Sequence, residues 1–199
     1  MKKKIVTVIC VLIILILGIF ALWYAKNRRG GVKVTSTVEY NVNTNLVLYR
    51  QDDEKWKDDK LGDSKYTVGS SGCVMTCIAM ALSDTNIGVN PKDFNSFLSE
   101  NNVFDADGNL QWGMLENIDG YHTAVYGAVS SDIIDACLKE GKYPIVKVHQ
   151  NNIFSYHHYI LIVGSEDGEY ICMDPLQSEI TKLSDYNNIV YAIRCVWYE

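Results

Sequence analysis

The sequence predicts an α+β domain preceded by one transmembrane helix. Three observations indicate this fold class: an uncharged apolar run near the N-terminus, helix signals in the first half of the remaining chain, and short strand-forming segments towards the C-terminus. Helices that precede a group of antiparallel strands commonly pack on the sheet as a second layer. We therefore expect a helical N-terminal part packed on an antiparallel sheet.

The apolar run covers residues 5–25 and follows three lysines. At about 1.5 Å per residue it is long enough to cross a hydrocarbon core of about 30 Å. The alternative is a cleavable signal peptide, but such an apolar region typically has about 7 to 15 residues and ends in small side chains, whereas this one ends in Trp23-Tyr24. We expect residues 1–25 to be a single-pass signal anchor in the lipid bilayer, with the following domain outside the cytoplasm.

Residues 26–45 are polar and rich in Gly, Thr, Ser and Asn, which is linker composition, and residues 46–199 suit one domain with one core. The net charge of −6 is unevenly distributed. Seven of the 18 basic residues and none of the 24 acidic residues precede position 34, which leaves 11 basic against 24 acidic residues, or −13, for the rest. This acidity argues against nucleic acid as a partner of the domain.

The helices are expected first along the domain. Their signals are apolar periodicity, a proline at a first-turn position and a glycine after the last turn. The predicted helices are Cys73–Leu82, Pro91–Asn101, Gln111–Ile118 and Ser131–Glu140.

The strands are expected after the helices. The segments are short, rich in β-branched and aromatic residues, and separated by turns such as Glu166-Asp167-Gly168. The predicted strands are Tyr143–His149, His158–Val163, Glu169–Met173 and Ile189–Trp197.

One set of side chains indicates nucleophilic chemistry. Cys73 stands in the first turn of an apolar helix, where unpaired N–H groups and partial positive charge favour a thiolate. His158 begins a strongly apolar strand, and Asp174 ends the next strand before Pro175. A thiol, an imidazole and a carboxylate are the groups of a Cys-His-Asp catalytic set.

Each of these residues also has a structural interpretation. A small buried cysteine is often core packing, a histidine before an apolar strand is often a strand-end group, and Asp-Pro is often only a turn. His157 is the neighbouring alternative to His158. Successive strand residues point to opposite faces, so only one of this pair can face Cys73.

The ordered motifs resemble the C39-like peptidases, second subfamily, of the papain-like cysteine hydrolase superfamily, from about residue 51 to residue 174. The histidine of that family lies six residues before a strand-ending glycine, which selects His158 through Gly164. The sequence departs from the family at Val74-Met75, at Cys77 and in its two adjacent histidines. The matching landmarks are Gln51 with Trp56, Gly72-Cys73 followed by Thr76 and Ile78-Ala79-Met80, Gly141 to Val146, His158 to Gly164, and Asp174-Pro175.

The resemblance implies a papain-like fold and a cysteine peptidase that cleaves a peptide or related amide through a thioester, and the apolar run of residues 5–25 adds the expectation that this enzyme is membrane-anchored. It implies Cys73 as nucleophile, His158 as base, Asp174 as the group that orients the imidazole, and Gln51 as an oxyanion-hole donor, without a cofactor. Two alternatives stay open. One is a peptide-binding module of the same fold without turnover, and the other is an acyltransferase that uses the same thioester. Some relatives trim leader peptides while fused to a transporter, and such a role for this chain would need a separate transporter partner.

Trp56 and Trp112 are candidates for the walls of a substrate cleft or for core packing.

The domain holds five cysteines, an odd number that leaves at least one free thiol. Cys73 and Cys77 lack the further ligands of a zinc site, so we expect no metal. Cys172 and Cys195 could pair if their strands are neighbours, but buried reduced thiols are the favoured interpretation. The remaining cysteine of the domain is Cys137.

Overall fold

A computed structural model describes residues 2–27, 30–150 and 156–199; within the first helix it describes the side chains of residues 9–20 and 22. The chain divides into two compact units, Met1–Gly31 and Val32–Glu199. The first unit contains helix α1 (Lys2–Asn27). Within the described part of the chain, no helix combines the length and the apolar character that a membrane span requires. The transmembrane helix expected over residues 5–25 therefore has no support from the structure.

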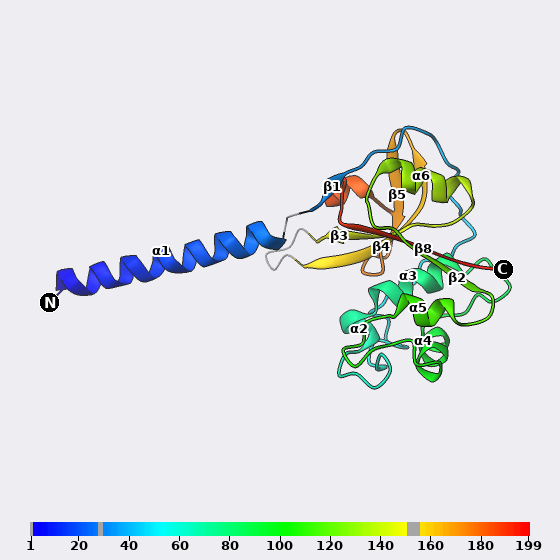
Figure 1. Ribbon diagram of the computed structural model, residues 1–199, viewed down its shortest axis with the longest axis horizontal. Coiled ribbons are helices and arrows are strands. Elements are labelled where there is room, and N and C mark those ends of the chain that lie inside the picture. Colours follow the sequence, from blue (N-terminus) through cyan, green and yellow to red (C-terminus); the bar gives the residue numbers. More distant parts are fainter. Residues whose placement is uncertain (1, 28–29, 151–155) are drawn as a thin grey trace. The chain divides into compact units, whose positions relative to one another are not determined.

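The second unit is a mixed fold of helices and antiparallel strands (Figure 1). This confirms the predicted α+β class. Its helices are α2 (Val68–Ser71), α3 (Cys73–Ala81), α4 (Pro91–Glu100), α5 (Trp112–Glu116), α6 (Ser131–Lys139) and the 3-10 helix η1 (Leu183–Tyr186). Its strands are β1 (Val32–Lys33), β2 (Tyr121–Val125), β3 (Ile145–His149), β4 (His157–Glu166), β5 (Glu169–Met173), β6 (Thr181–Lys182), β7 (Ile189–Val190) and β8 (Ala192–Tyr198).

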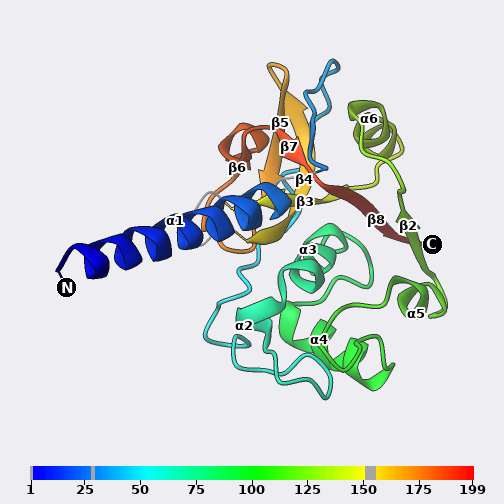
Figure 2. The same cartoon turned by 60° about the vertical axis from the view of Figure 1, so that its left-hand side comes forward.

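Six strands form the main antiparallel sheet, in the order β2-β8-β3-β4-β5-β6. The views in Figures 1 and 2 both show α2 to α5 on one side of the central strands and α6 on the other. The sheet is therefore buried on both faces at its centre. This explains why β4 is a nearly continuous apolar run instead of an alternating one.

Two hydrophobic clusters fill the spaces on either side of the sheet. Leu161 and Val163 of β4 pack with α3 and α4 in one cluster, whereas Ile160 and Ile162 pack with Ile134 of α6 in the other. This division follows from the alternation of side chains along a strand. The larger cluster, on the α3 side, is the one next to the predicted nucleophile.

The domain begins earlier in the structure than residue 46, the predicted start. Residues 26–45 were expected to be a linker, but the compact unit begins at Val32. Val34 is buried, and its N–H donates to the carbonyl of Asn188. Tyr40 forms an isolated antiparallel β-bridge with Ser165 of β4. A side chain on Gly164 would meet the backbone of Val42 at 2.8 Å, so glycine at this position lets the segment lie against β4. Because backbone hydrogen bonds hold this segment in the domain, its amino-acid composition does not distinguish it from a linker.

The predicted elements recur with shifted ends. The predicted Ile189–Trp197 strand is divided into β7 and β8, and the helix expected over Gln111–Ile118 covers only Trp112–Glu116. The short α2, the edge strands β2 and β6, and the 3-10 helix η1 were not predicted from the sequence.

Candidate active site

Two consecutive helices place Cys73. Thr67 and Ser70 form a capping box at the start of α2, and Gly72 separates α2 from α3. A side chain at Gly72 would meet the carbonyl oxygen of Val68 at 2.5 Å, so this close turn requires glycine. Cys73 is the first residue of α3, as predicted, and its side chain is partly exposed.

The sheet contributes His158. It is the second residue of β4, opposite Val148 of β3, and is 2% exposed. Its Nε2 lies 2.6 Å from Oδ1 of Asp174, which leaves Nδ1 as the nitrogen available to the thiol of Cys73. His157 is exposed and contacts the rings of His149 and Tyr191. The structure thus brings His158, and not its neighbour, to Asp174.

Asp174 follows β5 and is fully buried. Its Oδ1 accepts from His158 and from the N–H of Leu176 at 2.7 Å, and its Oδ2 accepts from the hydroxyl of Tyr186. Buried carboxylates are stable as anions when donors satisfy both oxygens. The carboxylate is therefore held rigidly and can fix the orientation of the imidazole.

The pKa values of the pair describe an imidazolium beside a carboxylate. Burial lowers the pKa of His158, but hydrogen bonds to Asp174 and to Cys73, together with the charges of these groups, outweigh it and raise that pKa to about 9. Burial raises the pKa of Asp174, but hydrogen bonds from His158 and Tyr186 outweigh it, so that pKa lies below its usual value. The influence of Cys73 on this pKa indicates that its thiol lies near the ring that Asp174 holds.

Gln51 is held against α2, the helix that precedes Cys73. It is 4% exposed, its N–H donates to the carbonyl of Pro175 at 2.8 Å, and its Nε2 donates to the carbonyl of Gly69 in α2 at 2.9 Å. These two bonds fix the amide between the Asp-Pro turn and the helix that leads to Cys73. The second hydrogen on Nε2 has no acceptor among the described residues.

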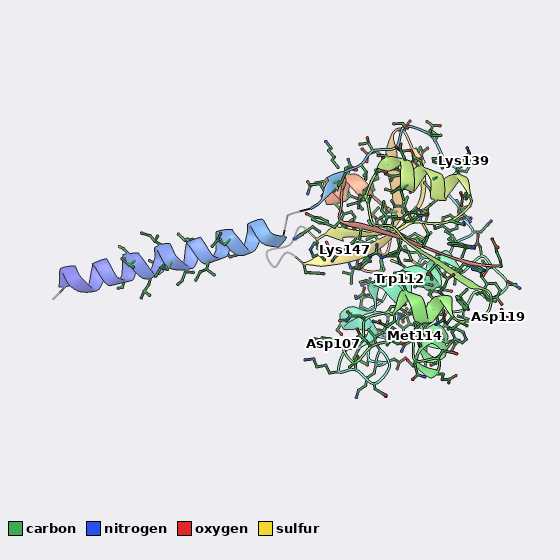
Figure 3. All side chains as sticks on the ribbon, viewed as in Figure 1. Asp107, Trp112, Met114, Asp119, Lys139 and Lys147 are labelled. Carbon is green, nitrogen blue, oxygen red and sulfur yellow. The ribbon has the colours of Figure 1, made fainter. Side chains whose placement is uncertain are left out.

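A cleft of about 570 Å³ opens at these residues. Gln51, Cys73 and His158 line it together, so three of the four predicted site residues share one cavity, and Asp174 lies behind His158. Trp112 also lines the cleft, whereas Trp56 is buried in the core and donates to the carbonyl of Arg50. Figure 3 shows Trp112 and Asp107, another lining residue, among the helices α2 to α5. The remaining walls include Leu61, Tyr66, Phe104, Leu110, Tyr156 and Leu176.

Tyr186 is the residue of the site that the sequence analysis missed. It lies in η1, 12 positions after Asp174, and its hydroxyl bonds the carboxylate oxygen that His158 does not use. Tyrosine is frequent in this chain, and no spacing rule marks one in a short 3-10 helix. Only the fold shows that it supports Asp174.

We expect Tyr186→Phe to lower the free energy of unfolding by about 1.5 to 3 kcal/mol, because a buried carboxylate loses a donor. We also expect a several-fold decrease in turnover, because Asp174 is less firmly placed. Tyr170→Phe is the matched control, since that buried hydroxyl bonds Asp135 at 2.8 Å, away from the cleft. Turnover and unfolding in urea are measured for both variants. If the two variants lose the same stability and have the same turnover, Tyr186 has no role in the site.

The raised pKa of His158 predicts how stability depends on pH. Because the folded-state value is about 9 and the unfolded value is near 6.5, the stabilisation is complete below pH 6.5 and is lost as the pH rises through 9. We expect a loss of about 3 kcal/mol in the free energy of unfolding over this interval. The measurement is urea unfolding at pH 6.5 and 9.5 for wild type and His158→Gln. The variant should lose less stability, and equal losses would contradict a protonated His158.

Comparison with known proteins finds a likeness among solved structures but none among family models or curated proteins. Among solved structures, the chain is similar to a predicted C39-like peptidase from Bacillus anthracis at 12% sequence identity and a TM-score of 0.49. That match covers 81% of this chain and 98% of the other.

Proposed function

We propose that this protein is a papain-like cysteine hydrolase of the C39-like group that cleaves a peptide or related amide bond. The observation that supports the proposal is the buried 2.6 Å hydrogen bond from His158 to Asp174, behind a cleft that Cys73 and His158 line together. A binding module has no need for a carboxylate with both oxygens bonded behind a histidine that faces a thiol.

The first chemical step is attack by the sulfur of Cys73 on the carbonyl carbon of the substrate. The imidazolium of His158 stabilises the attacking thiolate and then gives its proton to the leaving amine, which produces a thioester and a free amine. Asp174 accepts from Nε2 of His158 throughout and keeps Nδ1 directed at the reacting atoms.

The second step is attack by water on the thioester, with His158 accepting the proton of that water. A tetrahedral intermediate with a negatively charged oxygen forms in both steps and needs donors aimed at it. The free Nε2 hydrogen of Gln51 and the backbone N–H of Cys73 are the donors we assign to this oxygen. An acyltransferase would differ only in using an amine instead of water, which makes it the second candidate.

The test is labelling by a peptide-like electrophile, such as a peptidyl vinyl sulfone, at pH 6. We expect one adduct, on Cys73, because this thiol lines the cleft beside the imidazole of His158, whereas Cys77, Cys137, Cys172 and Cys195 are buried. Gln51→Ala should label normally but lower turnover about 10²- to 10³-fold, the usual effect of losing one oxyanion donor. Labelling that follows an ordinary thiol profile and is indifferent to His158→Gln would favour the binding module.

We further propose that residues 5–25 anchor the enzyme in a lipid bilayer as a single-pass segment, with the catalytic domain outside the cytoplasm. The support is the absence of any charged residue in this run and the three lysines before it. Retention of the full chain in membranes after alkaline carbonate washing is the expected result. Release into the supernatant would contradict the anchor, and protection of the domain from external protease in intact cells would contradict its orientation.

A further inference from the structure

Two further cysteines meet on the opposite side of the sheet from α3. Cys137 lies on the buried side of α6, and Cys195 lies in the middle of β8. They are 58 positions apart in sequence, are 2% and 0% exposed, and their sulfur atoms are 2.8 Å apart. Figure 3 shows Lys139, at the end of α6, on the other side of the strands from the cleft residues Trp112 and Asp107.

The fold explains why these two thiols face each other. On β8, Val196 belongs to the hydrophobic cluster on the α3 side, whereas Ile193 belongs to the cluster on the α6 side. Cys195 is separated from Ile193 by two positions and therefore shares its face. On α6, Cys137 follows Ile134 by three positions, so both lie on the helix face that packs against the sheet.

The alternative pairing of Cys195 with Cys172 is excluded by the order of the strands. Cys172 lies in β5, and the order β8-β3-β4-β5 places two strands between the two residues. With neighbouring strands about 4.8 Å apart, these strands are about 14 Å apart, which no disulfide spans. The thiol of Cys172 contacts the carbonyl of Tyr170 instead.

We propose that Cys137 and Cys195 form an intramolecular disulfide that fastens α6 to β8. The sulfur atoms need to approach by only about 0.8 Å to reach the covalent separation of about 2.03 to 2.05 Å. Neither residue lines the cleft, so the cross-link is independent of the proposed hydrolase activity.

Oxidation of the pair is a thiol–disulfide exchange in two steps. The thiolate of one cysteine, for example Cys137, attacks a low-molecular-weight disulfide such as oxidised glutathione, which forms a mixed disulfide and releases one thiol. Cys195 then loses its proton and attacks the sulfur of Cys137, which releases the second thiol. Two protein thiols are thus oxidised and one external disulfide is reduced.

The burial of both residues determines when this exchange takes place. An external disulfide does not reach either sulfur while α6 is packed on the sheet, so we expect the bond to form as the domain folds. An oxidising compartment supplies the necessary disulfide oxidant, in agreement with the proposed location of the domain outside the cytoplasm.

The experiment uses the full chain with Cys73→Ala, so that the cleft thiol takes no part. The protein is refolded with oxidised glutathione or with a reductant, denatured, alkylated and mapped by mass spectrometry. After oxidation we expect one cross-linked peptide pair joining Cys137 to Cys195, and a melting temperature about 5 to 15 °C above that of the reduced chain. After reduction, both residues should carry the alkyl group.

Two variants make the assignment specific. Cys137→Ser should lose the cross-link and the difference in melting temperature between oxidised and reduced samples, whereas Cys172→Ser should keep both. Alkylation of Cys137 and Cys195 after oxidative refolding, or a cross-link through another cysteine, would overturn the proposal. The peptide map of the parent chain decides the matter even if Cys137→Ser fails to fold.

Discussion

Replacing Cys73 by alanine is expected to lower turnover by about 10⁴-fold or more, because the reaction then has no nucleophile and no thioester forms. The fold should persist, since Cys73 is partly exposed and makes no core contact comparable with that of its buried neighbours. The measurement is kcat for hydrolysis of a chromogenic ester or amide, with unfolding in urea as the check on structure.

Cys77→Ala is the matched control for this variant. Cys77 lies one turn further along α3, is fully buried, and contacts the carbonyl of Tyr159 at 3.5 Å. Burial raises its pKa well above the ordinary thiol value, so it is inert. We expect reduced stability but turnover within a few-fold of wild type. Equal turnover in Cys73→Ala and Cys77→Ala would show that Cys73 is a structural thiol.

His158→Gln is expected to have the second largest effect, a decrease in kcat of about 10³-fold or more. The amide cannot take up or give back a proton, although it still fills the space beside Asp174. Labelling of Cys73 at pH 6 should fall with turnover, because both depend on the positive charge of His158.

His157→Gln is the control for this second variant. The two histidines are adjacent in β4, but His157 is exposed, and the partial desolvation of its ring together with the charge of Lys147 lowers its pKa. We expect turnover close to wild type. A large loss in His157→Gln with little change in His158→Gln would reverse the assignment of the base.

The parts of the fold that the sequence predicts are those with a strong local signal. Pro91 and the Asn90 cap start α4 where expected, and Ser130 caps α6. The apolar run of β4 is equally clear. Strand β2 was missed because it is short and is defined by its pairing with β8, 69 to 77 positions away. Such long-range pairing has no local signature.

In the candidate site, too, the residues with a local sequence signal were predicted, and those that depend on long-range packing were not. Cys73, His158 and Asp174 each stand at the end of an element with a clear pattern, and the order of these motifs indicates that they meet. Tyr186 and the pair of Cys137 with Cys195 depend on how distant elements pack, which the sequence does not display. The start of the domain at Val32 was missed for the same reason, since backbone hydrogen bonds and the buried Val34 and Ser36 hold that segment.

The measurement that tests the central claim most directly is detection of the acyl-enzyme. Wild-type protein is mixed with p-nitrophenyl acetate in a stopped-flow instrument and quenched for mass spectrometry. The account predicts a burst of about one p-nitrophenol per protein, an acetyl group on Cys73, and its release on a slower timescale. His158→Gln should show neither burst nor release. Absence of a burst in wild type, or acetylation that does not depend on His158, would contradict a thioester mechanism at Cys73.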